Sequence, residues 1–208
     1  MEITKNRTIN NYNLDLYISN NNKYNIPSLK KDDIIPKKLI GFNYAKSSKE
    51  KNIGIHFYLD DYQFERIWNS PEKYISILRQ YECVLTPDFS LYTDMPLAMQ
   101  IWNTYRSRII GVYLQQCGIK VIPTISWADK DSYDFAFEGI EEGSIVSIST
   151  IGVNSEEERE LYKNGVAQMI KQIKPKTILI YGKKIDYDFK DINVIYYKND
   201  RLERVRSL

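Results

Sequence analysis

One strand–helix–strand pattern in the middle of the chain constrains the fold most. An apolar run at residues 83–85 is followed by a polar turn, by an amphipathic stretch that begins near Pro96, and by a second apolar run at residues 120–125. Thr93 or Asp94 can cap the predicted helix. Its buried side is predicted to carry the apolar residues Leu97, Ile101, Trp102, Tyr105, Ile109 and Val112. Gly118 lies at the end of the amphipathic stretch, and glycine is typical of the position just after a helix. Two strands that are joined by a crossover helix run parallel, so this segment predicts a βαβ unit.

The same alternation continues on both sides of this unit. A near-continuous apolar run at residues 53–59 is typical of a strand that is covered on both faces. Residues 155–158, Ser-Glu-Glu-Glu, form a capping box that opens a helix. Further strands are predicted at residues 144–150, 177–181 and 193–197. We therefore expect an α/β fold with a mostly parallel sheet of βα units, either an open twisted sheet or an incomplete TIM-like barrel.

The first part of the chain is less regular. Residues 12–18 alternate apolar and polar side chains like a half-buried strand, residues 20–22 indicate a turn, and residues 39–43 indicate another short strand. A chain of 208 residues is large enough for one well-buried core. We predict an N-terminal extension with short strands over residues 1–50, which packs as an edge strand or a lid, and an α/β domain over residues 51–208.

The residue types exclude several kinds of site. His56 is the single histidine, which excludes the common zinc sites and leaves little room for a Ser-His-Asp triad. A glycine-rich phosphate loop is missing, which argues against a P-loop NTPase. Cys83 and Cys117 form no Cys-x-x-Cys pair, and we interpret them as small buried hydrophobic residues in a reducing compartment.

Charge and hydropathy bound the partners. A net charge of +2 is small for a protein that binds nucleic acid through a strongly basic patch. The sequence contains no run of about 20 apolar residues and no apolar signal-peptide core at its start. We expect a cytoplasmic protein without a membrane partner.

The predicted strand ends carry the candidate site. In open parallel sheets and in barrels, ligands bind at the carboxyl ends of the strands. Three carboxylates follow the first, second and third strands of the regular region, and they are Asp60, Asp88 and Asp129. Other polar and aromatic residues of the same rim are predicted to bind a ligand, and they are Ser90, Tyr92, Gln100, Asn103, Arg106, Trp127 and Lys183.

Each of these residues also has a purely structural interpretation. An aspartate at a strand end is most often a helix cap, which we favour for Asp61 and Asp94, and less so for Asp88 because Pro87 fixes the turn before it. Trp127 is more often a packing residue than a ligand platform. Arg106 and Arg108 point to different sides of their helix, so at most one faces the rim and the other is a surface or ion-pairing residue.

Two classes of function follow from this rim. In one, Asp60, Asp88 and Asp129 are catalytic and hold Mg²⁺ or Mn²⁺, which activates water against a phosphodiester while Arg106 or Lys183 neutralises charge. In the other, the protein binds without catalysis, with a nucleotide or nucleic acid stacked on Trp127 or Tyr92, or with a host or phage protein as its partner.

Ordered motifs along the central region carry a family resemblance. They are Thr-Pro-Asp-Phe-Ser-Leu-Tyr at residues 86–92, Met-Pro at 95–96, Asn-x-x-Arg-Ser-Arg at 103–108 and Gly-Ile-Lys-Val-Ile-Pro-Thr-Ile-Ser-Trp at 118–127. Over residues 53–183 the chain resembles the domain-of-unknown-function family 4417 of bacteria, phages and other mobile elements. The resemblance implies a phage or mobile-element origin, and hence the host cytoplasm, but no activity. An accessory protein of this kind favours binding over the Mg²⁺- or Mn²⁺-dependent hydrolase.

Overall fold

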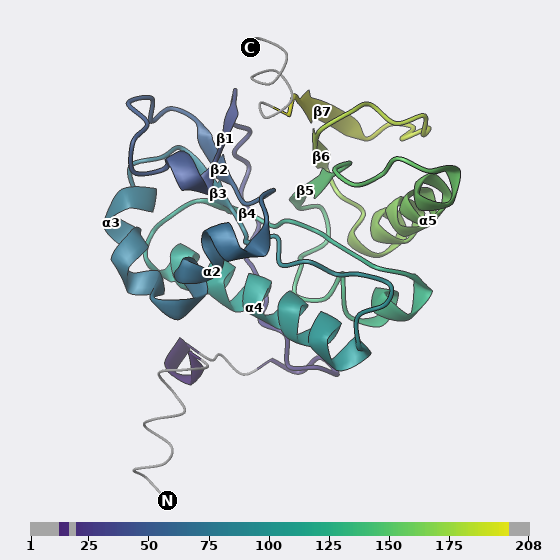
Figure 1. Cartoon of the computed structure of the whole chain (residues 1–208), viewed down its shortest axis with the longest axis horizontal. Helices are drawn as coiled ribbons and strands as arrows, with labels where there is room; N and C mark the ends of the chain where they lie inside the picture. Colours follow the sequence, from purple (N-terminus) through teal and green to yellow (C-terminus); the bar gives the residue numbers. More distant parts are fainter. Residues whose placement is uncertain (1–12, 17–19, 200–208) are drawn as a thin grey trace, which may run out of the picture.

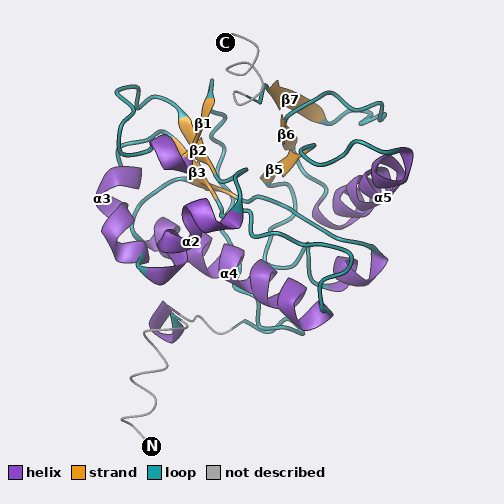
Figure 2. Ribbon diagram, viewed as in Figure 1, coloured by secondary structure: helices purple, strands orange, loops and turns teal. Residues whose placement is uncertain are grey.

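The protein has an α/β fold, as predicted (Figures 1 and 2). The computed structural model describes residues 13–16 and 20–199. Within these residues the strands are β1 (Leu39–Gly41), β2 (Gly54–His56), β3 (Cys83–Leu85), β4 (Val121–Ile122), β5 (Ile145–Ser149), β6 (Thr177–Tyr181) and β7 (Asn193–Tyr197). The helices are α2 (Asp61–Asn69), α3 (Ile75–Leu78), α4 (Leu97–Gln116) and α5 (Glu156–Ile173), with short 3-10 helices η1 (Leu14–Leu16), η2 (Phe42–Tyr44), η3 (Pro71–Tyr74) and η4 (Lys130–Asp134).

All of these strands run parallel and stand side by side in sequence order. Strands β1–β4 form one ladder and β5–β7 form a second. The residues after β4 join the two, because the Ile125 amide donates to the Ser147 carbonyl and the Ser147 amide donates to the Pro123 carbonyl, both at 2.8 Å. Successive right-handed crossovers put every helix on the same face. Figure 1 accordingly shows α2, α3 and α4 along β1–β4, and α5 along β5–β7.

The strands curve so that their other face encloses a packed interior. Inward-facing side chains from all seven strand regions form one cluster, which contains Leu39, Tyr58, Cys83, Leu85, Ile122, Ile145, Leu179, Tyr181 and Tyr197. Across the remaining gap, the Tyr197 hydroxyl donates to the carbonyl of Pro36 at 2.6 Å. Between residues 20 and 199 no strand pairing joins β7 to β1. The sequential order and the filled interior favour the incomplete TIM-like barrel over the open twisted sheet.

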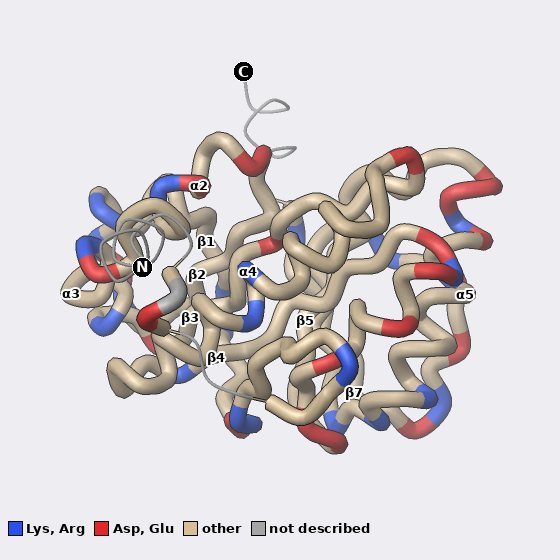
Figure 3. Tube along the Cα trace, turned by 90° about the horizontal axis from the view of Figure 1, so that it is seen from below, with Lys and Arg blue, Asp and Glu red and all other residues tan. Residues whose placement is uncertain are grey.

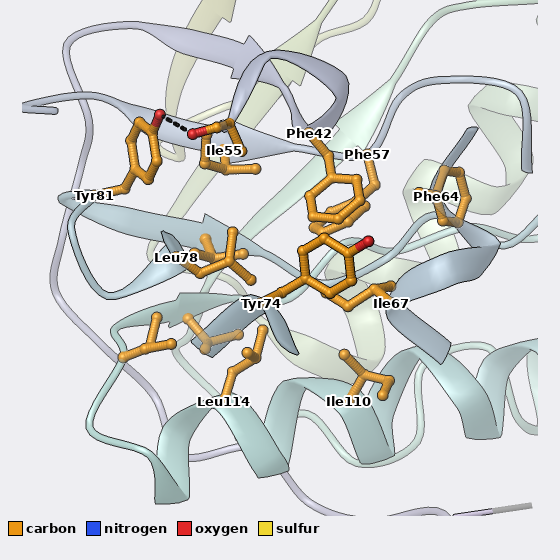
Figure 4. Close-up of a cluster of buried hydrophobic side chains, with 14 of the residues drawn as sticks. Phe42, Ile55, Phe57, Phe64, Ile67, Tyr74, Leu78, Tyr81, Ile110 and Leu114 are labelled. Atoms are coloured by element: carbon orange, nitrogen blue, oxygen red, sulfur yellow. Dashed lines mark hydrogen bonds between the residues drawn. The ribbon is translucent and has the colours of Figure 1, made fainter. Parts of the chain in front are cut away.

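A second layer of the core lies between the strands and helices α2–α4. Phe42 stacks on Phe57 with ring centroids 4.8 Å apart, and Leu114 of α4 reaches the same cluster (Figure 4). The Tyr81 hydroxyl lies at the edge of this layer and donates to the Ala45 carbonyl at 2.7 Å. Each large apolar side chain buried here contributes about 2 kcal/mol to folding. The barrel is therefore held by apolar packing on both faces of its strands.

Several predicted elements are confirmed at their bounds. Strands β6 and β7 span the predicted residues, and the Asn-rich turn forms around Asn22, whose side chain accepts from the Ile26 amide at 2.9 Å. The capping box of α5 is present: the Ser155 hydroxyl accepts from the Glu158 amide at 3.1 Å, and the Glu158 carboxylate accepts from the Ser155 amide at 2.7 Å.

The buried face of α4 differs from the predicted one. Leu97 was expected to be buried, yet it is 46% exposed, and Pro96 stands at the helix start in place of Thr93 or Asp94. Up to Arg108 the helix instead buries polar side chains, which are Gln100, Asn103, Thr104, Arg106, Ser107 and Arg108. Neither arginine lies on the surface, and Arg106 is an ion-pairing residue, which was one of the two predicted alternatives, because it pairs with Glu65 at 2.6 Å. Each guanidinium finds hydrogen-bond acceptors inside the protein.

The N-terminal region departs from its predicted structure in one place. The described part of residues 12–18 is a 3-10 helix, η1, and not a strand; the other residues of that prediction lie outside the described ones. Asn13 explains the turn, because its φ is 51° and its side-chain amide donates to the Trp68 carbonyl at 2.8 Å. Farther on, the Leu29 amide donates to the Gly139 carbonyl at 2.9 Å, and β1 lies in the sheet beside β2.

Charges are spread over the surface. Basic and acidic positions are both scattered along the tube in Figure 3, consistent with the small net charge. Of the helices in the described part of the chain, none combines the length and the hydropathy that a membrane span requires. Both cysteines are free thiols, Cys83 buried and Cys117 half-buried.

Candidate functional site

A pocket of about 540 Å³ opens at the carboxyl ends of β2, β3, β4 and β5. We call it the rim pocket. Its wall includes Tyr58, Asp60, Asp88, Ser90, Tyr92, Ser126, Trp127, Glu158 and Tyr162. Residues that immediately follow parallel strands come together at one end of a barrel, which is why segments distant in sequence share this wall.

Asp88 is the most perturbed carboxyl of the rim pocket. It follows β3 and Pro87, and its Oδ1 accepts a short hydrogen bond from the Ser126 hydroxyl, which follows β4. Burial raises the pKa of Asp88 to about 7; the Ser126 hydrogen bond opposes the rise and the nearby charge of Asp61 adds to it. Because Asp88 is half-buried and faces the pocket, it can exchange a proton with a bound molecule near neutral pH.

The loop after Asp88 is fixed by hydrogen bonds from two helices. Asp61 at the start of α2 accepts from the Ser90 hydroxyl at 2.8 Å and from the Ser90 amide at 3.2 Å. Asn103 of α4 donates to the Ser90 carbonyl at 2.7 Å, and Gln100 donates to the carbonyls of Tyr92 and Met95 at 3.2 and 2.9 Å. This part of the pocket wall is therefore held in place before any ligand arrives.

Arg106 supports that loop from behind. Its guanidinium donates to Glu65 at 2.6 Å and to the Asn103 side chain at 2.7 Å, and it lies 3.8 Å from the centre of the Phe89 ring. Desolvation lowers the pKa of Arg106, and the ion pair with Glu65 opposes that. Arg106 thus positions Asn103 and does not line the rim pocket.

Trp127 forms an aromatic wall against α5. A side-chain carbon at Gly165 would lie 2.0 Å from the indole nitrogen, so the glycine is what lets the ring lie directly on the helix. The ring also contacts Tyr162 at 5.3 Å between centroids. Tyr162 is 7% exposed, and among the described residues its hydroxyl has no hydrogen-bond partner although the residue lines the pocket. A buried hydroxyl that lacks a partner is costly and suits a ligand acceptor or donor.

Tyr58 separates the rim pocket from a smaller one. Its hydroxyl shares a 2.6 Å hydrogen bond with Ser147, and its ring stacks on Tyr181 at 5.1 Å and on His56 at 5.5 Å. Burial raises the pKa of Tyr58 well above its ordinary value. The smaller pocket, of about 270 Å³, is lined by Tyr58 together with polar residues of the β1 side, including Asn43, Ser47 and Ser48.

Five of the predicted site residues meet in the rim pocket, and these are Asp60, Asp88, Ser90, Tyr92 and Trp127. Gln100, Asn103 and Arg106 lie behind the wall, where they hold the loop. Lys183 is exposed, and its backbone bonds the Thr150 hydroxyl at 2.8 and 3.0 Å. Asp129 lies outside the pocket and accepts from the Asp131 amide at 3.0 Å at the start of η4.

The three predicted metal ligands do not form one group. Asp60 and Asp88 share the rim pocket, whereas Asp129 is engaged as a cap. Over residues 13–16 and 20–199, no three side chains of His, Cys, Asp or Glu are grouped to hold a metal ion. A cation here would have to use Asp60 and Asp88 with oxygen ligands of another kind.

The residues of the wall that the sequence analysis did not predict include Ser126, Tyr58, Glu158 and Tyr162. Ser126 stands at the predicted strand end, but nothing in the sequence pairs it with Asp88. Tyr58 is an inward-facing residue just after β2, and a period-two count from Gly54 would have placed it inside the barrel. Glu158 and Tyr162 belong to α5, where the capping box and the apolar stripe explain them without a pocket.

Two curated phage proteins are similar to this chain. The gene 1 protein of Mycobacterium phage L5 is 42% identical over 184 residues, which cover 86% of this chain and 80% of that protein. The gene 1 protein of Mycobacterium phage D29 is 38% identical over 175 residues, covering 82% of this chain and 65% of that protein, so the chain spans less than two thirds of this second relative. No solved structure matches. The model of the domain of unknown function (DUF4417) matches residues 18–198, and the chain belongs to this family.

Proposed function

We propose that this phage-related protein binds a small ligand with a planar ring and hydrogen-bond donors, such as a nucleobase or nucleoside, in the rim pocket. The observation that carries the proposal is the pairing of a desolvated carboxyl, Asp88, with an aromatic wall, Trp127, in one pocket at the carboxyl end of the barrel. Ligand pockets of this fold class lie at that end.

The aromatic side chains support a ring-bearing ligand. Trp127, Tyr58 and Tyr92 line the pocket from three different strand ends, and a base or another planar ring gains about 1–3 kcal/mol by stacking on such a side chain. The Asp88 carboxyl adds specificity, because its oxygen accepts from ring N–H groups when ionised and its hydroxyl donates when protonated.

The charge of the wall favours an uncharged or cationic ligand over a phosphate ester. Asp60, Asp88 and Glu158 line the pocket, and within the described chain no Lys or Arg does. Phosphate groups are normally held by Arg, Lys or a helix N-terminus. Nucleosides and bases are therefore better candidates than nucleotides or a nucleic-acid backbone.

A protein partner is the second candidate, and one observation supports it. Large apolar side chains stand exposed on the segments around the pocket mouth: Tyr62 is 80% exposed, Tyr92 59% and Met99 52%. Exposed aromatic and methionine side chains are enriched where proteins bind each other. A host or phage protein would then cover the same rim that a small ligand enters.

Thermal unfolding tests both the small-ligand proposal and the metal-dependent alternative. A ligand that binds the folded state raises the unfolding midpoint. We expect bases or nucleosides to raise it and the matching nucleotides to raise it less, without added metal. Asp88→Asn should abolish the rise, and Asp94→Asn, an exposed aspartate outside the pocket, should not.

Three results would redirect the assignment. A rise with nucleotides that requires Mn²⁺ and is lost in both Asp60→Asn and Asp88→Asn would favour the phosphodiester hydrolase. A rise that Asp88→Asn leaves intact would place the ligand elsewhere. No rise with any of these compounds would leave the protein partner, which Tyr62→Ser and Met99→Ser should weaken.

A further inference from the structure

We propose that the rim pocket is catalytic and hydrolyses glycosides whose leaving group is a planar aromatic ring, nucleosides among them, with Asp88 as the proton donor and Asp60 as the second carboxylate. This inference rests on the proposed function, because it assumes that the ring occupies the aromatic part of the rim pocket. It goes further by naming a reaction and the role of each carboxylate.

Asp88 is placed so that its carboxyl can donate a proton to a ligand in the rim pocket. Its Oδ1 accepts from Ser126, whereas Oδ2 receives no hydrogen bond from the part of the chain that the structure describes. The carboxyl is desolvated by its surroundings yet reaches the pocket. A general acid needs contact with the leaving group and a pKa close to the working pH.

Asp60 provides a contrasting carboxylate on the neighbouring strand end. It is exposed, it lines the same pocket, and its Oδ2 accepts from the Gln63 amide at 2.8 Å. Two carboxyls in opposite environments, one desolvated and one solvated, are the arrangement that separates an acid from a base or nucleophile. Glycoside hydrolysis is one reaction class that uses such a pair.

The shape of the site fits a ligand of two unlike parts. The aromatic wall of the rim pocket suits the leaving ring. The adjoining smaller pocket is lined by Asn43 and by Ser47 and Ser48, whose hydroxyls donate to backbone carbonyls at 3.3 and 3.1 Å and can still accept from a hydroxyl-rich sugar. Tyr58 and Leu59 line both pockets, so the two pockets adjoin along these residues. The buried Tyr162 hydroxyl, which lacks a partner in the described chain, independently points to a polar ligand atom in the rim pocket.

The proposed step balances without any cofactor. As the bond between the anomeric carbon and the leaving nitrogen or oxygen breaks, the bond's electron pair goes to the leaving atom and the Asp88 proton is transferred to it. Water adds to the anomeric carbon and gives its proton to the Asp60 carboxylate. The products are the free sugar and the free ring compound, and proton exchange with solvent restores Asp88 to its acid form and Asp60 to its ionised form.

The experiment offers the purified full chain a panel of 4-nitrophenyl glycosides, both anomers of riboside, glucoside and galactoside, and the common ribonucleosides. Release of 4-nitrophenol or free base measures turnover, and the unfolding midpoint measures binding in the same samples. We expect at least one compound to be cleaved, with kcat/KM at least 100-fold lower in Asp88→Asn and unchanged in Asp94→Asn. Asp60→Asn should also lower kcat.

The outcomes separate this inference from the proposed function. A raised midpoint without cleavage of any compound overturns catalysis and leaves ligand binding standing. Cleavage that persists in Asp88→Asn overturns the role of Asp88. Neither cleavage nor a raised midpoint overturns both proposals.

Discussion

Helix α4 buries two chemically different surfaces along its length. Up to Arg108, in the part that we call its polar half, the buried side chains are polar, and Asn103, Arg106 and Arg108 each bond backbone or side chains of neighbouring segments. From Ile109 on, in the part that we call its apolar half, the buried side chains are apolar, with Ile110 and Leu114 in the cluster of Figure 4. One continuous helix thus serves the loops of the pocket at one end and the hydrophobic core at the other.

Burial of apolar side chains and burial of polar side chains have different effects on the protein. Apolar packing is nondirectional and stabilises the barrel as a whole. Hydrogen bonds from a buried polar residue fix the position of a particular backbone segment, at the expense of desolvating the polar group. We expect substitutions in the apolar half to lower stability without changing the pocket, and substitutions in the polar half to change both.

Arg108→Met should have the largest effect on stability. Arg108 is fully buried and donates to the carbonyls of Glu138, Thr124 and Ala136 at 3.1, 3.0 and 2.8 Å, while no carboxylate among the described residues pairs with it. Methionine fills the space but leaves three carbonyls unsatisfied, so we expect the free energy of unfolding to fall by about 4 kcal/mol. Denaturant unfolding measures this free energy. The value for Arg108→Lys should lie between those of the wild type and Arg108→Met. A loss under about 1 kcal/mol would contradict the directional role of the polar half.

Leu114→Ala should lower the free energy of unfolding by about 3 kcal/mol. Leu114 is fully buried, and a loss of this size is typical when a leucine is shortened and a cavity remains. The ligand response of the rim pocket should persist, because Leu114 is in the apolar half and the hydrogen bonds that hold the pocket loop come from Asp61, Asn103 and Gln100. Denaturant unfolding and the ligand-dependent midpoint are measured on the same variant. A lost ligand response at unchanged stability would show that the two halves are not separate.

Asn103→Ala should cost about 1–2 kcal/mol of stability and weaken ligand binding. The substitution removes the hydrogen bond to the Ser90 carbonyl and the acceptor of the Arg106 guanidinium, so the pocket loop loses one of its ties. The ligand-dependent rise of the midpoint should shrink more than the stability loss explains. An unchanged ligand response would mean that Asp61 and Gln100 hold the loop without Asn103.

Met99→Ser should change the free energy of unfolding by less than about 0.5 kcal/mol, because Met99 is exposed on the same helix. It serves as the control for α4. A larger loss would mean that this exposed face is covered in solution, as a partner-binding surface would be.

How much the sequence predicts differs between these regions. Periodicity finds apolar burial well, so β6, β7 and α5 fall at the predicted residues and the α/β class is right. Polar burial has no periodic signal, which is why the first half of α4 was assigned the wrong buried face. The rule that ligands lie at strand ends located the pocket, and Asp60, Asp88 and Trp127 reach it. This rule does not distinguish a ligand-binding aspartate from one that caps a helix, and Asp129 caps η4.

The state of Asp88 in the rim pocket is tested most directly by the unfolding midpoints of the wild type and Asp88→Asn between pH 5 and 8. The folded protein keeps this carboxyl protonated up to a pKa of about 7, whereas the unfolded chain releases the proton near 4. Between about pH 4 and 7 the carboxyl ionises in the unfolded chain and stays protonated in the folded protein, so the free energy of unfolding of the wild type falls as the pH rises. The Asn variant has no carboxyl at this position and lacks this fall.

We predict that the unfolding midpoint of Asp88→Asn increases relative to that of the wild type as the pH rises, and that the difference levels off above about pH 7. A difference that stays constant across this range, or a wild type that gains on the variant as the pH rises, would contradict a desolvated, protonatable Asp88 and with it the site built around it.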